Sequence, residues 1–247
     1  MKTLLRTMLV LACPLFLFAE DAAKAPANKT LNAYRIYAKD GKDAALRAGI
    51  AAHVAKFHNT NWKWRVSEVL TGPDSGSYMI TEGPYSWTAL DDRGDLGPEH
   101  QKDYDTNITP YVEKTTPTAY ETYEDELSTV APGAFAPTKT LISHVFAKPG
   151  RGPSEYALLK QWKKVWEKRG INVGVWTSFF SGEAQFTVVY RLKNGWKDLD
   201  SDTMGTRAAA DAVYGPGGYE RLMEETTRNV DHSYGEMIEF KAELSSK

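Results

Sequence analysis

Five histidines have the widest chemical scope in this chain of 247 residues, because imidazole binds metals and changes its charge near neutral pH. They are His53, His58, His100, His144 and His232. No two stand three or four residues apart, the spacing that puts two imidazoles on one face of a helix. The spacing of five between the first two is expected to point them apart. The sequence therefore predicts no metal site.

Other signatures of catalysis are missing. The sequence has no Gly-x-Ser-x-Gly around a nucleophilic serine and no phosphate-binding Gly-x-x-x-x-Gly-Lys-Ser/Thr. Carboxylates between Tyr120 and Glu126 alternate with Tyr and Thr, which predicts an edge strand with one solvated face. No reaction and no cofactor can be assigned from these patterns.

The first 19 residues resemble a secretory signal peptide. Two basic residues precede an apolar run that ends at Phe18, and Ala19 precedes a polar stretch. The run is shorter than the roughly 20 residues of a membrane-spanning helix. We expect an exported protein, periplasmic or extracellular, with no membrane span and with its only cysteine, Cys13, removed. The alternative is a lipoprotein signal that leaves Cys13 lipidated.

The charges exclude one class of partner. The chain has 30 Lys and Arg against 32 Asp and Glu, with a net charge of -2, and the basic residues are scattered among acidic ones. A nucleic-acid partner is therefore not expected.

Residues 20–29, rich in Ala with Lys, Asp and Pro, predict a flexible lead-in to the folded part.

A motif occurs twice in the remaining chain. Trp87-x-x-Leu90-Asp91 returns as Trp196-x-x-Leu199-Asp200, at a shift of 109 residues, and the same shift aligns IYAKDG at 36–41 with VFAKPG at 145–150. Residues 128–139 between the copies are rich in Pro, Gly, Ala and Thr, typical of a linker. We predict two related halves, 30–127 and 140–247, in which each Trp closes one end and each Asp caps the next segment.

Both halves have one predicted order of elements: strand, helix, strand, strand, helix, strand. Apolar residues at helical spacing predict a helix from Asp43, its expected N-cap, to Asn59. The other predicted helices are 98–113, 154–169 and 203–229, the last broken at Gly215–Gly218. The predicted strands, from alternation and β-branched or aromatic content, are 31–39, 62–71, 77–82, 120–127, 140–148, 171–181, 185–192 and 231–243.

This order is the ferredoxin-like arrangement, whose sheet carries helices on one face only. A second copy would cover the other face. We therefore predict an α+β fold in which two tandem ferredoxin-like repeats pack sheet to sheet as an intramolecular α+β barrel.

With its repeated Trp-x-x-Leu-Asp motif, the chain resembles the dimeric α+β barrel superfamily, which includes antibiotic-biosynthesis monooxygenases, NIPSNAP-type proteins, muconolactone isomerase and haem enzymes related to chlorite dismutase. The resemblance implies a ligand inside the barrel or between sheet and helices. It also implies an alternative activity, that of a cofactor-free oxygenase or isomerase, less readily a haem enzyme. One fold hosts many chemistries, so no activity follows from it alone.

Strand alternation selects the candidate ligand-binding residues. Ile36 suits the helix side of the first strand, which turns Arg35 and Tyr37 toward the space between the sheets, and the repeat places His144 and Phe146 there too. Arg35 and His144 could bind an anion or carboxylate, and His144 could transfer protons. The alternative is an internally hydrogen-bonded pair. The preferred function is binding of a small molecule or a partner in this space.

His53 lies near the apolar side of the first predicted helix. It is the best single candidate for a haem or metal ligand, although hydrogen-bonded core filling is the more common role at such a position. His58 is at the end of the same helix, where a cation or partial cation suits the helix dipole, and no chemistry is assigned to it.

Overall fold

The computed structural model describes residues 28–134, 137–178, 180–183, 185–200 and 204–247. The predicted signal peptide, Cys13 and most of the predicted lead-in lie outside these residues. Within them, no helix is long and apolar enough to cross a lipid bilayer.

Eight antiparallel strands form a closed barrel, in the order β3-β2-β9-β6-β8-β7-β5-β1, and pairing of β1 with β3 completes the circle. A ninth strand, β4 (Val112–Thr115), pairs with β1 beside β5. Closure satisfies the backbone groups that an open sheet would expose at its edges. The barrel strands are β1 (Thr30–Ala38), β2 (Trp64–Val69), β3 (Tyr78–Tyr85), β5 (Ala119–Tyr123), β6 (Lys139–Ala147), β7 (Val173–Ser178), β8 (Gln185–Leu192) and β9 (Val230–Phe240).

Two pairings join the N-terminal and C-terminal strands. Residues 67–69 of β2 pair with residues 238–240 of β9, and residues 122–123 of β5 pair with residues 176–177 of β7. β5 is therefore no edge strand, and the expectation of a solvated carboxylate face there is wrong for Glu121, which is 9% exposed.

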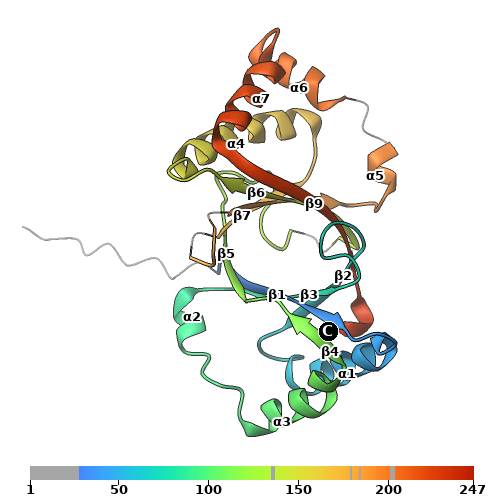
Figure 1. Ribbon diagram of the computed structural model, residues 1–247. Helices are drawn as coiled ribbons and strands as arrows, with labels where there is room; N and C mark the ends of the chain where they lie inside the picture. Colours follow the sequence, from blue (N-terminus) through green and yellow to red (C-terminus); the bar gives the residue numbers. More distant parts are fainter. Residues whose placement is uncertain (1–27, 135–136, 179, 184, 201–203) are drawn as a thin grey trace, which may run out of the picture.

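The helices cover the outside of the barrel in two groups, at opposite ends of the view in Figure 1. The first group is α1 (Asp43–Phe57) and α3 (Pro98–Asn107), with the short α2 (Trp87–Asp91) near them. The second is α4 (Gly152–Arg169), α6 (Thr206–Tyr214) and α7 (Gly218–Asn229), with the short α5 (Lys197–Asp200). Each group packs on outward apolar side chains of the strands, such as Ile36 in one core and Val188 in the other.

Two local predictions need correction. Lys42, not Asp43, is the N-cap of α1 and makes no side-chain capping bond; the carboxylate of Asp43 instead accepts a hydrogen bond from the Tyr78 hydroxyl at 2.6 Å. The break in the last helical region is confirmed. α6 ends before Gly215 and α7 begins after Gly217, and both glycines have a positive φ, 79° and 75°, which favours glycine.

The repeated Trp motif forms short surface helices. At the first copy, Ser86 is the cap, because its Oγ accepts from the Ala89 N–H at 3.1 Å, and Asp91 lies inside α2. Trp87 is 51% exposed and contacts the ring of Tyr120, with centroids 5.7 Å apart. The expectations that Asp91 caps and that Trp87 closes an end by burial are therefore wrong.

One buried carboxyl in the first turn of α4 makes stability depend on pH. Glu155 is 2% exposed, its Oε2 has no hydrogen-bond partner among the described residues, and burial raises its pKa to about 7 against an opposing hydrogen bond from Asn229. The folded protein thus holds a proton that the unfolded chain, with a pKa near 4.5, releases earlier. Stability is lost as the pH rises from about 4.5 through 7.

We predict that Glu155→Gln raises the free energy of unfolding by about 2 kcal/mol at pH 8, and by much less at pH 4.5, where the carboxyl is protonated in the folded state and about half protonated in the unfolded chain. Urea unfolding at the two pH values measures this difference. The control is Glu167→Gln, at an exposed position of the same helix. An equal effect of Glu155→Gln at both pH values would contradict the account.

Candidate functional site

The barrel interior holds a cavity of about 280 Å³. Its walls are mainly apolar side chains that point inward from the strands, and proline and glycine residues of the 128–139 segment line it too. Such a concave, mostly apolar space with a few polar groups is the usual form of a small-molecule site. The apolar side chains include Leu31, Met79, Ile142, Trp176, Val189 and Ile238.

Arg35 and His144 meet inside the barrel on one buried carboxylate. Arg35 Nη2 lies 2.5 Å, and His144 Nε2 2.9 Å, from Oε1 of Glu236, whose residue is 3% exposed. Arg35 Nε is also 3.4 Å from Oδ2 of Asp74. Strand alternation correctly predicted that both side chains face inward. The contacts match the predicted alternative of an internal pair, completed by an acid on β9 that the sequence analysis missed.

Both ring nitrogens of His144 are engaged. With the ring proton on Nε2, the imidazole donates to Glu236, while Nδ1 accepts from the amide of Gln185 at 2.6 Å. The ring of Tyr234 stacks on it, with centroids 4.5 Å apart and planes 24° apart. Proton transfer through His144 would require one of these hydrogen bonds to break.

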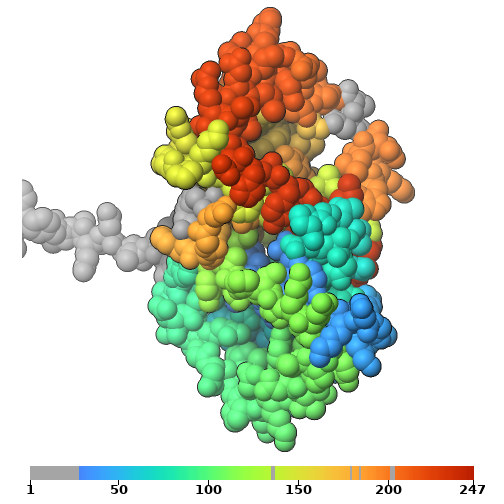
Figure 2. All heavy atoms as spheres, viewed as in Figure 1, coloured from blue at the N-terminus to red at the C-terminus, as the bar shows by residue number. Residues whose placement is uncertain are grey.

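Tyr37 and Phe146 do not line the cavity. The Tyr37 hydroxyl donates to Asp74, and burial together with this hydrogen bond raises the pKa of Tyr37 to about 12. Phe146 stacks on His232, with centroids 4.3 Å apart. Asp74 belongs to the turn between β2 and β3, which Figure 2 shows beside the red β9; within this turn a Cβ on Gly72 would lie 2.7 Å from the Gly235 carbonyl oxygen.

Two arginines that the sequence analysis overlooked line the cavity beside the linker segment. Arg65 Nη2 donates to the Pro137 carbonyl at 2.7 Å, and Arg191 Nη1 to the Ala131 carbonyl at 3.3 Å. Burial, and then the charge of Arg191, lower the pKa of Arg65 to about 10; burial also lowers that of Arg191. Among the described residues, neither guanidinium forms an ion pair with a carboxylate.

The alternation of inward and outward side chains along β2 and β8 could have identified these two arginines. The prediction of inward residues used only the first strand of each half. Glu121 was missed for a different reason, because its strand was assigned to an edge. Its carboxyl lines the cavity, accepts a hydrogen bond from the Thr187 hydroxyl at 3.3 Å, and has its pKa raised by burial.

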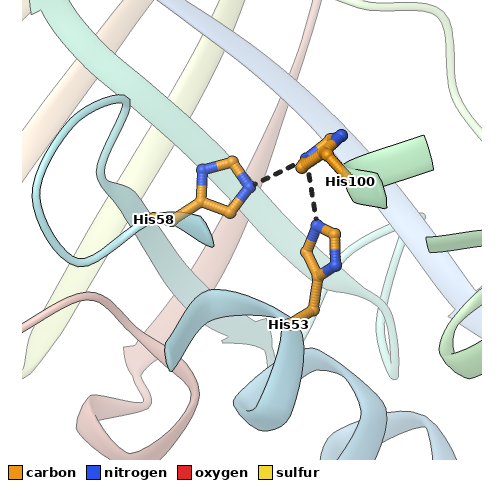
Figure 3. Close-up of side chains that lie close together, drawn as sticks. All are labelled: His53, His58 and His100. Carbon is orange, nitrogen blue, oxygen red and sulfur yellow. Dashed lines mark hydrogen bonds between the residues drawn. The ribbon is translucent and has the colours of Figure 1, made fainter. Parts of the chain in front are cut away.

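His53 lies outside the barrel, in the layer between α1 and the sheet. His58 and His100 join it there (Figure 3), with Nε2 of His100 3.1 Å from Nε2 of His53 and 3.2 Å from Nε2 of His58. One nitrogen from each ring lies within 4.8 Å of the others. The expectation that a spacing of five separates His53 from His58 is wrong because α1 ends at Phe57, and His58 leaves the helical path with ψ of 10°.

The three imidazoles favour the neutral form. Burial lowers the pKa of His53, of His100 and, most strongly, of His58, to about 4, although its hydrogen bond to the Trp62 carbonyl opposes the shift. Near neutral pH, His58 is therefore uncharged. A charged His58 that stabilises the end of α1 is therefore not what the structure favours, since the loss of water outweighs the helix dipole.

Comparisons with known proteins concern the fold. No protein-family model and no curated protein sequence matches the chain. Among solved structures, a presumed monooxygenase from Fusobacterium nucleatum superposes with a TM-score of 0.55 at 13% identity over 85% of this chain and 91% of its own. An anthrone oxidase-like protein gives 0.53 at 14% over 86% and 92%. A mutant chlorite dismutase from Candidatus Nitrospira defluvii gives 0.52 at 8% over 87% and 92%.

These similar structures belong to the dimeric α+β barrel superfamily, in agreement with the resemblance seen in the sequence. Identities this low establish shared architecture and no shared activity. The chain therefore has an α+β fold built on a closed barrel of eight antiparallel strands, and its function has to be argued from its own side chains.

Proposed function

We propose that this protein binds a small amphipathic anion, such as an aromatic or aliphatic carboxylate, inside its barrel. The observation that carries the proposal is the pair Arg65 and Arg191 at the wall of a mainly apolar cavity, in which Arg35 and His144 are already paired with Glu236. The apolar walls would contact the hydrocarbon part of such a ligand, and the guanidinium groups would bind its charged end.

The electrostatics of the two arginines supports an anionic ligand. A charge removed from water is costly unless it is paired, and here each guanidinium lies near a like charge with carbonyl oxygens as its hydrogen-bond acceptors. A carboxylate between them would supply the opposite charge. Arginine suits this role because its planar fork can bind both oxygens of one carboxylate.

Arg35 has a different role in this proposal. Its charge is already balanced by Glu236 and Asp74, so it shapes the cavity wall and does not hold the anion. The sequence analysis predicted that Arg35 and His144 bind the ligand through their charges. In this proposal they instead form part of the cavity wall that the ligand contacts.

The alternative function is that of a cofactor-free oxygenase or isomerase acting in the same cavity. It is favoured by the position of His144 on the cavity wall and by the names of the similar structures, a presumed monooxygenase and an anthrone oxidase-like protein. It is disfavoured because both ring nitrogens of His144 already have partners. Consumption of dissolved oxygen with a bound ligand would support an oxygenase over a binding protein.

We also infer that the barrel arose by tandem duplication and that the protein is exported. The duplication is supported by the strand order, β5-β1-β3-β2 in the first half and β9-β6-β8-β7 in the second, which is the same order by position along each half. Export is supported by the pattern of residues 1–19.

The anion proposal predicts selectivity for charge at constant shape. The full chain should bind 1-naphthoate at least about 10-fold more tightly than the uncharged 1-naphthamide, since a charged hydrogen bond adds about 1.5 kcal/mol or more. Replacement of either arginine, Arg65→Gln or Arg191→Gln, should remove most of that preference. Fluorescence of Trp176, which lines the cavity, or calorimetry measures the affinities.

The control is Arg228→Gln, an arginine with a side chain 69% exposed on α7, which should bind both compounds as the unaltered chain does. Equal affinity for the two compounds, or an unchanged preference in both cavity variants, would refute the proposal.

A second prediction concerns the network that shapes the cavity. Glu236→Gln should lower the free energy of unfolding by about 3 kcal/mol, because it leaves Arg35 buried with a weakened partner. Glu239→Gln, on the same strand but with a 30% exposed side chain paired to Lys139 and Lys241, should cost less than about 1 kcal/mol. Equal losses of unfolding free energy in the two variants, measured by urea unfolding, would contradict the prediction that the buried pair contributes more than the exposed one.

A further inference from the structure

We propose that His53, His58 and His100 form a binding site for one divalent transition-metal ion, separate from the barrel cavity. The three side chains come from α1, from the residue just after α1, and from α3, and their rings converge in Figure 3. The proposal does not depend on the ligand proposed for the barrel.

The hydrogen bonds of the cluster leave lone pairs facing one another. Nδ1 of His53 lies 2.9 Å from Oδ2 of Asp103, and Nδ1 of His58 lies 2.6 Å from the Trp62 carbonyl oxygen. Both acceptors require the ring proton on Nδ1, so each neutral ring presents the lone pair of Nε2. These two Nε2 atoms both face Nε2 of His100.

Hydrogen bonds among the three rings cannot give every Nε2 lone pair a donor. Nε2 of His100 carries at most one hydrogen, which can serve one of its two neighbours and leaves the other lone pair without a donor. Protonation of a further ring would place a charge among buried groups, since His53 and His58 are both 0% exposed. A metal ion accepts a lone pair from every ring and resolves the conflict.

The distances suit a tetrahedral ion. Zinc binds histidine nitrogen at about 2.0–2.1 Å, which places two tetrahedral ligands about 3.3 Å apart. The two Nε2 separations that involve His100 are 3.1 and 3.2 Å, and the ligand atoms of all three rings lie within 4.8 Å of one another. Small ring movements would complete the coordination.

The surrounding residues hold the rings as outer partners of metal ligands commonly do. Asp103 and the Trp62 carbonyl orient the two buried rings, and Trp64 stacks on His58 with centroids 4.1 Å apart. α3 reaches this position because Gly49 of α1 lacks a side chain; a Cβ there would lie 1.9 Å from the Asn107 carbonyl oxygen.

The donor set indicates the class of ion. Imidazole nitrogens suit zinc, copper, iron and nickel better than magnesium or calcium. Three histidines leave a fourth position for water or substrate, the pattern of catalytic rather than structural zinc sites. His100 is the half-buried member of the cluster, and the other two are buried, so the open position is expected on its side.

The test is direct titration of the full chain, made without a histidine tag and cleared of metal by a chelator. We expect one equivalent of Zn²⁺ to bind and to raise the melting temperature, and Co²⁺ to give the visible absorption of a four-coordinate ion. His100→Gln should weaken Zn²⁺ binding by about 100-fold or more, and Asp103→Asn, which keeps all three imidazoles, by about 10-fold.

His232→Gln is the matched control, because His232 is exposed and outside the cluster, and it should bind Zn²⁺ as the unaltered chain does. The His100 and Asp103 variants should keep the far-UV circular dichroism spectrum of the unaltered chain, which shows that they are folded. Absence of stoichiometric binding, or binding that survives His100→Gln but falls in His232→Gln, would overturn the proposal.

Discussion

Closure of the barrel is the constraint on which the rest of the structure depends. The pairings of β2 with β9 and of β5 with β7 join the two halves into one ring of strands, so side chains at inward positions are buried or half-buried. A polar group there must find a partner inside the molecule. Arg35, His144 and Glu236 satisfy one another in this way. In the part of the chain that the structure describes, Arg65 and Arg191 contact carbonyl oxygens and no carboxylate, which is the reason to propose a ligand for them.

The two layers between helices and sheet are built differently. In the second half, Trp162 and Trp166 contribute apolar rings to the layer under α4 and line a cavity of about 330 Å³ there. In the first half, His53 occupies the position that a shift of 109 residues assigns to Trp162, and two more imidazoles surround it. Replacement of an apolar ring by polar ones in a core costs stability unless their nitrogens are satisfied. The layer under α4 in the C-terminal half is built from tryptophans at these positions, so a specific role is the better explanation for the histidine cluster.

Local periodicity predicted most helices and strands and the inward direction of Arg35 and His144, although the predicted helix 98–113 extends past the end of α3 at Asn107 and into β4. The closed α+β architecture was predicted from the repeated pattern and the superfamily resemblance. The sequence analysis did not predict the partner of Arg35 and His144, Glu236, whose position depends on the register between β6 and β9. It placed Glu121 on an edge because the pairing that buries this residue joins strands far apart in the chain. It separated His58 from the histidine cluster because helical geometry was extended beyond the residue where α1 ends. Local patterns define the elements, whereas the sites depend on how distant elements meet.

The central claim is that the interior of the barrel is a cavity prepared for an anion and is not a solid core. A crystal structure of the full chain grown with 1-naphthoate tests it most directly. The account predicts the naphthalene ring between the apolar walls, with its carboxylate oxygens within hydrogen-bond distance of Arg65 and Arg191. A cavity closed by rearranged side chains, or a ligand bound only outside the barrel, would contradict it.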